Sequence, residues 1–326
     1  NGKVDLHLHL DGAITETFFR KYAHKYGLVV PADLRAALSV TSGCRDLRDY
    51  LRCFSLPTQL LQWEDVLEEC AYDLIRRLSA QGLLYAEIRF APALHCRKGL
   101  SQNAAVAAVL SGIRRAKAAF PSIYVNLLLC FLVGDDTHHH ETLQTAAHFY
   151  GKGVAGLDLA GAEGLVPLAA YQTLFAEVRE MGIPFTIHAG ECGDYSNIEM
   201  AVQWGARRIG HGVAAQKSIS CMELLKERGI AVECCFSSNL QTRAVSRPQL
   251  HPIYRFYQAG IPVTVNTDNP TVSSTDLKQE HIMLREYFAF SDQDFFQMDR
   301  YAIESAFLDR RQKNDLLHCL SFEPYQ

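Results

Sequence analysis

Short runs of apolar and β-branched residues alternate along the chain with longer segments in which apolar residues recur at helical spacing. Eight such runs predict strands, at Val4–Leu10, Leu83–Pro92, Ile123–Leu132, Val154–Gly161, Pro184–Gly190, Arg208–Gly212, Ala231–Ser238 and Pro262–Asp268. The segments between them predict helices, for example at Gln102–Phe120, Leu165–Met181, Ser218–Arg228 and Gln249–Gly260. Eight strands alternating with helices indicate either a closed parallel barrel or a long doubly wound sheet.

Polar residues gather where these strands end. They are His9 and Asp11, His188 to Glu191, His211, Ser237 to Asn239, and Asp268 with Asn269. The strand ends of a barrel converge on one mouth, whereas those of an open sheet spread along a crevice. The pattern therefore favours an α/β fold of the (β/α)₈ TIM-barrel type, with residues 1–326 as a single domain. A helical insertion at about Pro31–Ala80 follows the first strand, and Thr275–Cys319 adds helices at the C-terminal end.

Composition narrows the class of partner. The formal net charge is −4, from 32 basic and 36 acidic side chains, which argues against a nucleic-acid or anionic-lipid surface. No apolar run reaches the ~18 residues of a membrane span. The ten cysteines are scattered without a CxxC pair, and no apolar leader precedes the first strand, so we expect reduced thiols in a cytoplasmic protein. A small-molecule substrate fits best, and the oligomeric state stays open.

The first strand carries an unusual polar face. Because side chains alternate faces in a strand, Asp5, His7, His9 and Asp11 lie together, opposite an apolar face. Two imidazoles on one face can bind the same metal ion; alternatively, they are hydrogen-bonded core histidines. Two inward carboxylates beside them would make a costly polar core unless a cation compensates. This favours the metal interpretation.

Three further strand ends complete a candidate site. His188 ends one strand and is followed by Glu191, which could alternatively cap the next helix. His211 lies between two glycines, and Asp268 precedes Asn269. Three imidazoles and one carboxylate suit one Zn²⁺ per chain with room for a water, whose pKa zinc lowers toward about 7. Glu191 and His211 then remain for acid–base work.

The order of these motifs resembles a known family. HxHxDG at the first strand, HAGE at residues 188–191, GHG at 210–212 and TD at 267–268 are similar to adenosine deaminases of the amidohydrolase superfamily. Glu87–Pro92 with His95, and Asp158–Glu163, extend the resemblance, which spans residues 4 to about 310. The combination is far more specific than any single motif.

The resemblance implies a division of labour in the site. The implied zinc ligands are His7, His9, His188 and Asp268. Glu191 would donate a proton to purine N1, while His211 and Asp268 would orient and deprotonate the attacking water. The implied substrate-binding residues are His9, Asp11 at the ribose 5′-hydroxyl, Gly161 at N3 through its N–H, Asn269 at N7, and Leu51 and Phe54 as an apolar flap. Where many relatives have a second Asp, this chain has Asn269, whose amide can still donate to N7.

The implied reaction is hydrolysis of adenosine and 2′-deoxyadenosine to inosine and ammonia. Related 6-aminopurines are the alternative substrates: adenine, aminofutalosine and N6-methyl-AMP. Asp11 favours a nucleoside, because base-specific relatives tend to carry Glu there, whereas Arg52, Arg243 and Arg247 leave room for a phosphate. A barrel that binds without catalysing would have no evident need for all of these polar groups. The PCxxC element of cytidine-type deaminases is absent.

Overall fold

The structure is a computed structural model that describes residues 2–322. Eight strands lie within these residues, at β1 Lys3–His9, β2 Leu83–Phe90, β3 Tyr124–Leu132, β4 Val154–Ala160, β5 Thr186–Ala189, β6 Arg208–His211, β7 Ala231–Cys234 and β8 Val263–Val265. Each coincides with a predicted run, although β2 to β8 are all shorter than their runs. The strand prediction is therefore confirmed, with the largest errors at the carboxyl ends.

All strand pairs are parallel and join neighbours in the sequence. β1 to β4 form one continuous ladder and β5 to β8 form another. Single bridges connect the two halves, between Leu157 and Phe185 on one side and between Leu8 and Asp268 on the other. The second connection includes hydrogen bonds of 2.8 Å from His9 N to Asp268 O and from Asp268 N to His7 O. The sheet thus closes into the predicted (β/α)₈ barrel.

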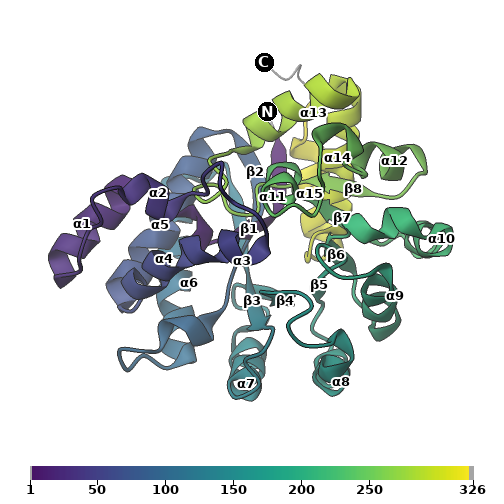
Figure 1. Cartoon of the computed structure of the whole chain (residues 1–326). Helices are drawn as coiled ribbons and strands as arrows, with labels where there is room; N and C mark the ends of the chain where they lie inside the picture. The colour runs from purple at the N-terminus through teal and green to yellow at the C-terminus, as the bar shows by residue number, and fades with distance from the viewer. Residues whose placement is uncertain (1, 323–326) are drawn as a thin grey trace.

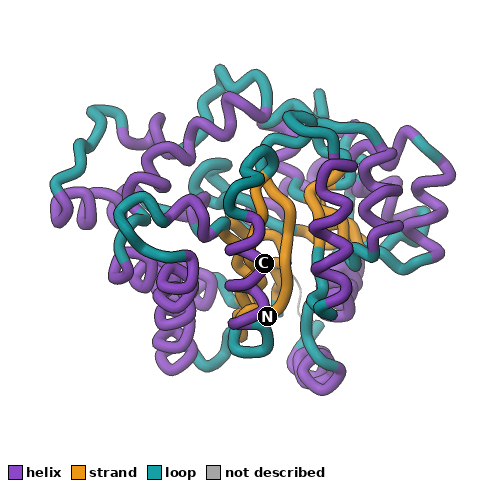
Figure 2. The backbone as a smooth tube through the Cα atoms, turned by 90° about the horizontal axis from the view of Figure 1, so that it is seen from below, coloured by secondary structure: helices purple, strands orange, loops and turns teal. Residues whose placement is uncertain are grey.

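Helices surround the strands, as Figures 1 and 2 show. Those that follow strands β2 to β8 are α6 Gln102–Ala119, α7 His139–Phe149, α8 Gln172–Glu180, α9 Tyr195–Trp204, α10 Ile219–Glu227, α11 Phe236–Gln241, α12 Ile253–Gln258 and α13 Leu277–Phe288. The chain continues through α14 Asp292–Ser305 and α15 Arg310–Cys319, which confirms the predicted C-terminal helices. Within residues 2–322, none of the helices is both long enough and apolar enough to traverse a bilayer.

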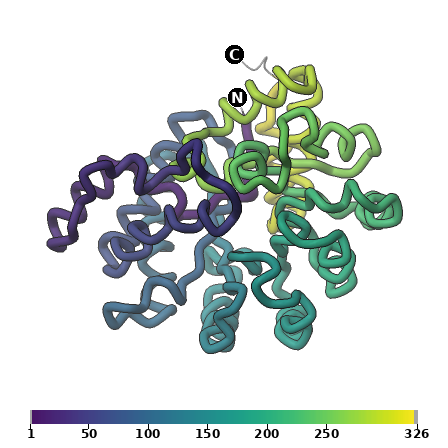
Figure 3. The backbone as a smooth tube through the Cα atoms, in the orientation of Figure 1, coloured from purple at the N-terminus to yellow at the C-terminus, as the bar shows by residue number. Residues whose placement is uncertain are grey.

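The segment after β1 is also helical. It contains α1 Glu16–Tyr26, α2 Leu34–Leu38, α3 Leu47–Leu51, α4 Ser55–Leu60 and α5 Glu64–Ala80. Figures 1 and 3 show α1 and α2 projecting to one side, while α3 lies over the middle of the barrel. The insertion therefore begins before Pro31, with α1, which starts at the Thr15 cap and ends at Gly27 in the left-handed conformation.

One predicted strand includes the start of a helix. The sequence predicts a single strand at Ala231–Ser238, but the strand ends at Cys234 and α11 begins at Phe236. Apolar runs of this length do not distinguish a strand from the start of a helix. The consequence matters for the site, because Ser238 and Asn239 lie on a helix that begins at the barrel mouth.

The alternation of β1 behaves as predicted. Leu8 and Leu10 are buried in the main apolar core, and Val4 and Leu6 pack in a second cluster that includes residues of α14 and α15. The polar face of the same strand is also buried, with His7 fully inaccessible and the His9 side chain 12% exposed. The barrel interior is accordingly polar at this strand, which requires partners for each charged group.

Candidate metal and catalytic site

Three imidazoles and one carboxylate converge at the carboxyl ends of the strands. His7 and His9 come from β1, His188 from β5, and Asp268 follows β8. Nε2 of His7 and Nε2 of His9 lie 3.3 and 3.4 Å from Asp268 Oδ1, and the Nε2 atoms of His9 and His188 are 3.3 Å apart. The structure thus brings together the four side chains that the resemblance implied as ligands.

The spacing of these donor atoms suits a single metal ion. Donor atoms that each lie about 2.0–2.1 Å from one zinc ion are separated by roughly 3 Å. The three separations above match that value. In addition, His7 Nε2 is buried without a hydrogen-bond partner among the described residues, a costly state unless the atom binds a ligand. The donor set therefore fits one Zn²⁺.

Buried carboxylates orient two of the imidazoles. His7 Nδ1 donates to Glu233 in β7 at 2.7 Å, and His188 Nδ1 lies 3.0 Å from Asp158 in β4. A proton held on Nδ1 leaves the lone pair on Nε2, which points toward the other donors. Glu233 carries no local signal in the sequence, and Asp158 stands there only as part of a motif.

A chain of buried ion pairs lies beneath the site. Arg89 pairs with Asp158 at 2.9 Å and with Glu233 at 3.0 Å. Arg208 pairs with the other oxygen of Glu233 at 2.6 Å and also with Glu87. All five side chains are fully buried. The residues that orient His7 and His188 are therefore held by two guanidinium groups rather than by water.

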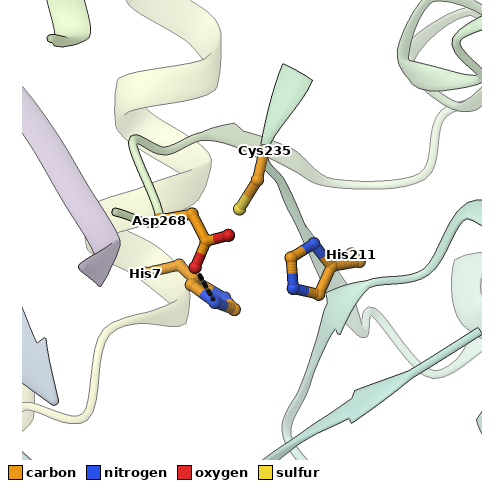
Figure 4. A group of neighbouring side chains, drawn as sticks. All are labelled: His7, His211, Cys235 and Asp268. Atoms are coloured by element: carbon orange, nitrogen blue, oxygen red, sulfur yellow. Dashed lines mark ion pairs between the residues drawn. The ribbon is translucent and has the colours of Figure 1, made fainter. Parts of the chain in front are cut away.

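A second group of potential ligands overlaps the first. Figure 4 shows His7, His211, Cys235 and Asp268, whose donor atoms also lie within 4.8 Å of one another. The three-imidazole group also has donor atoms 3.3–3.4 Å apart, the spacing expected when they all bind one ion. The set with three imidazoles is consequently the better metal site.

Two residues of the site have strained backbones. His211 and Asp268 have φ angles of 64° and 59°, in the left-handed region that residues with a Cβ rarely adopt. Such strain persists where surrounding structure over-determines it, and it clusters at functional sites. At Asp268 the pairing with β1 provides that constraint.

Glu191 lies beside His211. Its Oε2 is 3.7 Å from His211 Nε2, and its Oε1 accepts a hydrogen bond of 3.1 Å from the Thr242 hydroxyl. Burial, reinforced by the charge of Asp268, raises the pKa of Glu191 to about 8. The carboxyl group can therefore carry a proton at neutral pH. The alternative role as a helix cap is wrong, because Asp194 caps α9.

The loop that carries Glu191 is bound by another carboxylate. Oε2 of Glu163 accepts hydrogen bonds of 2.8–3.0 Å from the backbone N–H groups of Glu191, Cys192 and Gly193. Its Oε1 accepts from Gly190 N at 2.7 Å and from the Asn197 side chain at 2.9 Å. Glu163 was seen in the sequence only as the end of a motif, since no local spacing connects it to the loop.

Two further acceptors face the site without partners. The Oδ1 atoms of Asp11 and Asn269 are buried and make no hydrogen bond within the described part of the chain. Gly12 makes room for Asn269, because a Cβ on Gly12 would lie 2.0 Å from Asn269 Oδ1. Burial raises the pKa of Asp11 to about 6. Both side chains are available to a bound polar molecule.

The remaining predicted residues lie around this centre. Gly161 directly follows β4, with a φ of 109° that favours glycine. Leu51 ends α3 and Phe54 ends the next turn, both half-buried. Between α3 and the loop after β8, Tyr50 and Ser273 share a hydrogen bond of 2.7 Å. Tyr50 was not among the predicted site residues, although it lies in the same amphipathic segment as Leu51 and Phe54.

Comparison with known proteins agrees with this chemistry. The family model for adenosine deaminase matches residues 2–321. An adenosine deaminase from Haemophilus ducreyi is 40% identical over 325 residues, covering 97% of this chain and 94% of its own.

Solved structures share the architecture. An N6-mAMP deaminase from Arabidopsis has a TM-score of 0.88 and 25% identity, with 98% of this chain and 97% of its own covered. An amidohydrolase from Burkholderia ambifaria with bound zinc has a TM-score of 0.85 at 23% identity, covering 96% and 88%. The second likeness supports the fold alone.

Proposed function

The chain belongs to the adenosine deaminase family, and from this premise we propose that it hydrolyses adenosine and 2′-deoxyadenosine to inosine and ammonia. It is a hydrolytic deaminase of 6-aminopurines. The observation that carries the proposal is the convergence of His7, His9, His188 and Asp268 beside the buried carboxyl group of Glu191, whose pKa burial raises.

We assign the metal site to these three histidines and Asp268, with zinc as the resident ion. The separations of 3.3–3.4 Å between their donor atoms support this assignment. When bound, zinc lowers the pKa of a water molecule from about 15.7 toward about 7 and so provides hydroxide at neutral pH.

Different residues around the metal site carry out the separate proton transfers. Glu191 donates its proton to purine N1, which makes C6 more electrophilic. His211 and Asp268 together orient the attacking water and provide for the removal of its proton, and C6 becomes tetrahedral before ammonia leaves. The 3.7 Å separation of Glu191 from His211 supports this arrangement, because both groups can then reach one purine ring.

The substrate is bound by polar groups of the site and by the apolar flap formed by Leu51 and Phe54. Asp11 accepts from the ribose 5′-hydroxyl, and Asn269 donates from its amide to N7. Gly161 offers its N–H to N3, while Leu51 and Phe54 cover the sugar. His9 contributes at the ribose end as well as to the metal. The buried, unpartnered Oδ1 atom of Asp11, an acceptor, supports the first assignment.

A substrate panel tests the proposal. Initial rates with adenosine, 2′-deoxyadenosine, adenine, AMP, N6-methyl-AMP and aminofutalosine are compared by purine absorbance and ammonia release. Adenosine should give the highest kcat/KM. A faster reaction with adenine or with a nucleotide would replace the substrate assignment and leave the family intact.

We also propose that the enzyme works in the cytoplasm. Its ten cysteines are all unpaired in the described residues, and a reducing compartment keeps thiols in that state.

A further inference from the structure

A buried hydrogen-bond relay reaches the outer nitrogen of His211. Ile253 N, at the start of α12, donates to His251 Nδ1 at 3.2 Å. His251 Nε2 lies 3.1 Å from Asn239 Oδ1, and Asn239 Nδ2 lies 3.0 Å from His211 Nδ1. The side chains of the relay are at most 3% exposed. The contacts of Asn239 with His251 and with His211 do not follow from sequence spacing, because they join the start of α12 to α11 and β6.

The direction of every bond in the relay follows from its first member. A backbone N–H can only donate, so His251 Nδ1 must be an acceptor and the ring's single proton is on Nε2. That proton requires an oxygen at Asn239, which turns the NH₂ of the amide toward His211. His211 Nδ1 is then an acceptor as well. Burial also lowers the pKa of His251 to about 3, in agreement with a neutral ring.

We propose that His251 and Asn239 are positioning residues that hold His211 as the neutral tautomer with its proton on Nε2, so that His211 acts as a hydrogen-bond donor and not as the base. Its Nε2 is the nitrogen near Glu191, at 3.7 Å. A nitrogen that already carries a proton has no lone pair to accept another. A neutral imidazole that donates toward developing negative charge is an established catalytic device.

The consequence for the reaction rests on the proposed deaminase function, whereas the tautomer itself does not. As the oxygen of water bonds to C6, its O–H bond breaks and the proton passes to the Asp268 carboxylate. His211 keeps its own proton and donates a hydrogen bond to the attacking oxygen. Asp268 later delivers the proton to the leaving amine, and the remaining hydroxyl proton passes to Glu191 as C6 becomes a carbonyl, so no proton is gained or lost at His211.

Nitrogen NMR of the zinc-loaded enzyme tests the tautomer directly. The protein is labelled with ¹⁵N-histidine, and the two His211 signals are those that disappear in His211→Gln. We expect a protonated Nε2 and an unprotonated Nδ1. A proton on Nδ1, whether the ring is neutral or cationic, would overturn the proposal even if adenosine is deaminated normally.

Asn239→Asp tests the consequence. A carboxylate accepts from both neighbours, so it should move the His211 proton to Nδ1 and leave Nε2 without a donor. Loss of one such donor typically lowers kcat by about 10²–10³-fold. We expect a fall of that order, a change in KM of only a few-fold, unchanged zinc content, and ¹⁵N signals with the two nitrogens exchanged.

The matched control is Asn103→Asp, which adds the same charge on the exposed face of α6 and should behave as wild type. His251→Leu is a second variant, in which the Asn239 amide can rotate and the His211 signals should show a mixture of tautomers. An Asn239→Asp enzyme with exchanged signals and wild-type kcat would refute the donor role. If Asn239→Asp does not fold, the wild-type spectrum alone still decides the tautomer.

Discussion

Glu163 holds the loop that carries Glu191, and replacing it with Gln tests how much of catalysis depends on that loop. Its carboxylate accepts hydrogen bonds from four consecutive backbone N–H groups, those of residues 190–193, and from the Asn197 amide. Gln keeps the shape of the side chain but has only one acceptor oxygen. Whichever way the amide turns, an NH₂ group then faces at least one backbone N–H.

The magnitude follows from these contacts. If the Gln oxygen takes the place of Oε2, three hydrogen bonds survive as neutral ones and the bonds from Gly190 N and from Asn197 Nδ2 are lost. A hydrogen bond to a charged acceptor contributes about 1.5–3 kcal/mol, and an unpaired buried donor costs about 1–3 kcal/mol. We therefore expect Glu163→Gln to lose about 2–5 kcal/mol of stability. Displacement of Glu191 should lower kcat by at least about tenfold, within the 10²–10⁴-fold that a positioned acid contributes.

The assay combines thermal unfolding with adenosine deamination followed by absorbance. The control is Glu177→Gln, which removes the same charge from an exposed position on α8 and should leave both Tm and kcat unchanged. Zinc content should stay at the wild-type level in both variants, because Glu163 contacts no proposed ligand. A Glu163→Gln enzyme with wild-type Tm and kcat would show that the loop is held by other contacts.

Four other predictions follow from the site and its surroundings. His9→Ala should lose zinc and activity together, as measured by metal analysis and turnover, since three remaining donors no longer complete the set; normal zinc occupancy would contradict the ligand assignment. Glu191→Gln should keep its zinc while kcat falls about 10²–10⁴-fold; an unchanged kcat would place the N1 proton elsewhere. Asn269→Ala should narrow the difference in kcat/KM between adenosine and 7-deazaadenosine, which lacks the N7 acceptor. An unchanged difference would show that Asn269 makes no hydrogen bond to N7. Burial raises the pKa of Glu280 to about 7 from 4.5, so its contribution to stability is present below pH 4.5 and is lost as pH rises through 7. Relative to Glu280→Gln, the wild type should lose up to about 1.4 kcal/mol of unfolding free energy per pH unit in that window, and parallel stability curves would count against the shift.

Much of the fold could be predicted because its signals are local. Alternation along β1 separates Leu8 and Leu10, which pack in the core, from His7 and His9, which face the barrel interior. Parallel strands in a barrel bring their carboxyl ends to one mouth, so His188 could be expected near β1 without any knowledge of contacts. The grouping of the four candidate ligands was predictable because each lies in or near the carboxyl end of a strand.

The groups that orient those ligands have no local signal. Glu233 is separated from His7 by 226 residues, and in the sequence it is simply one acidic residue in an apolar run. The roles of Asn239 and His251 were not predicted for a different reason. Asn239 follows a predicted strand, but the structure places it in helix α11. His251 falls within a predicted helix, but the helix begins only at Ile253. Their roles depend on the angle at which short helices meet the barrel.

The charges beneath the site explain why so many polar groups can be buried together. Glu87, Asp158 and Glu233 carry three negative charges against the two positive charges of Arg89 and Arg208, which leaves a net charge of −1 in a region without exposed atoms. The Asp268 carboxylate, whose pKa its histidine neighbours hold well below the usual range, brings the sum to −2. An uncompensated buried charge costs several kcal/mol, and the divalent cation proposed among the imidazoles would offset this negative charge. The ion-pair chain would then do more than orient His7 and His188. Its residual negative charge would favour a dication over a monocation, while Arg89 and Arg208 hold the carboxylates of Asp158 and Glu233 in place behind the imidazoles.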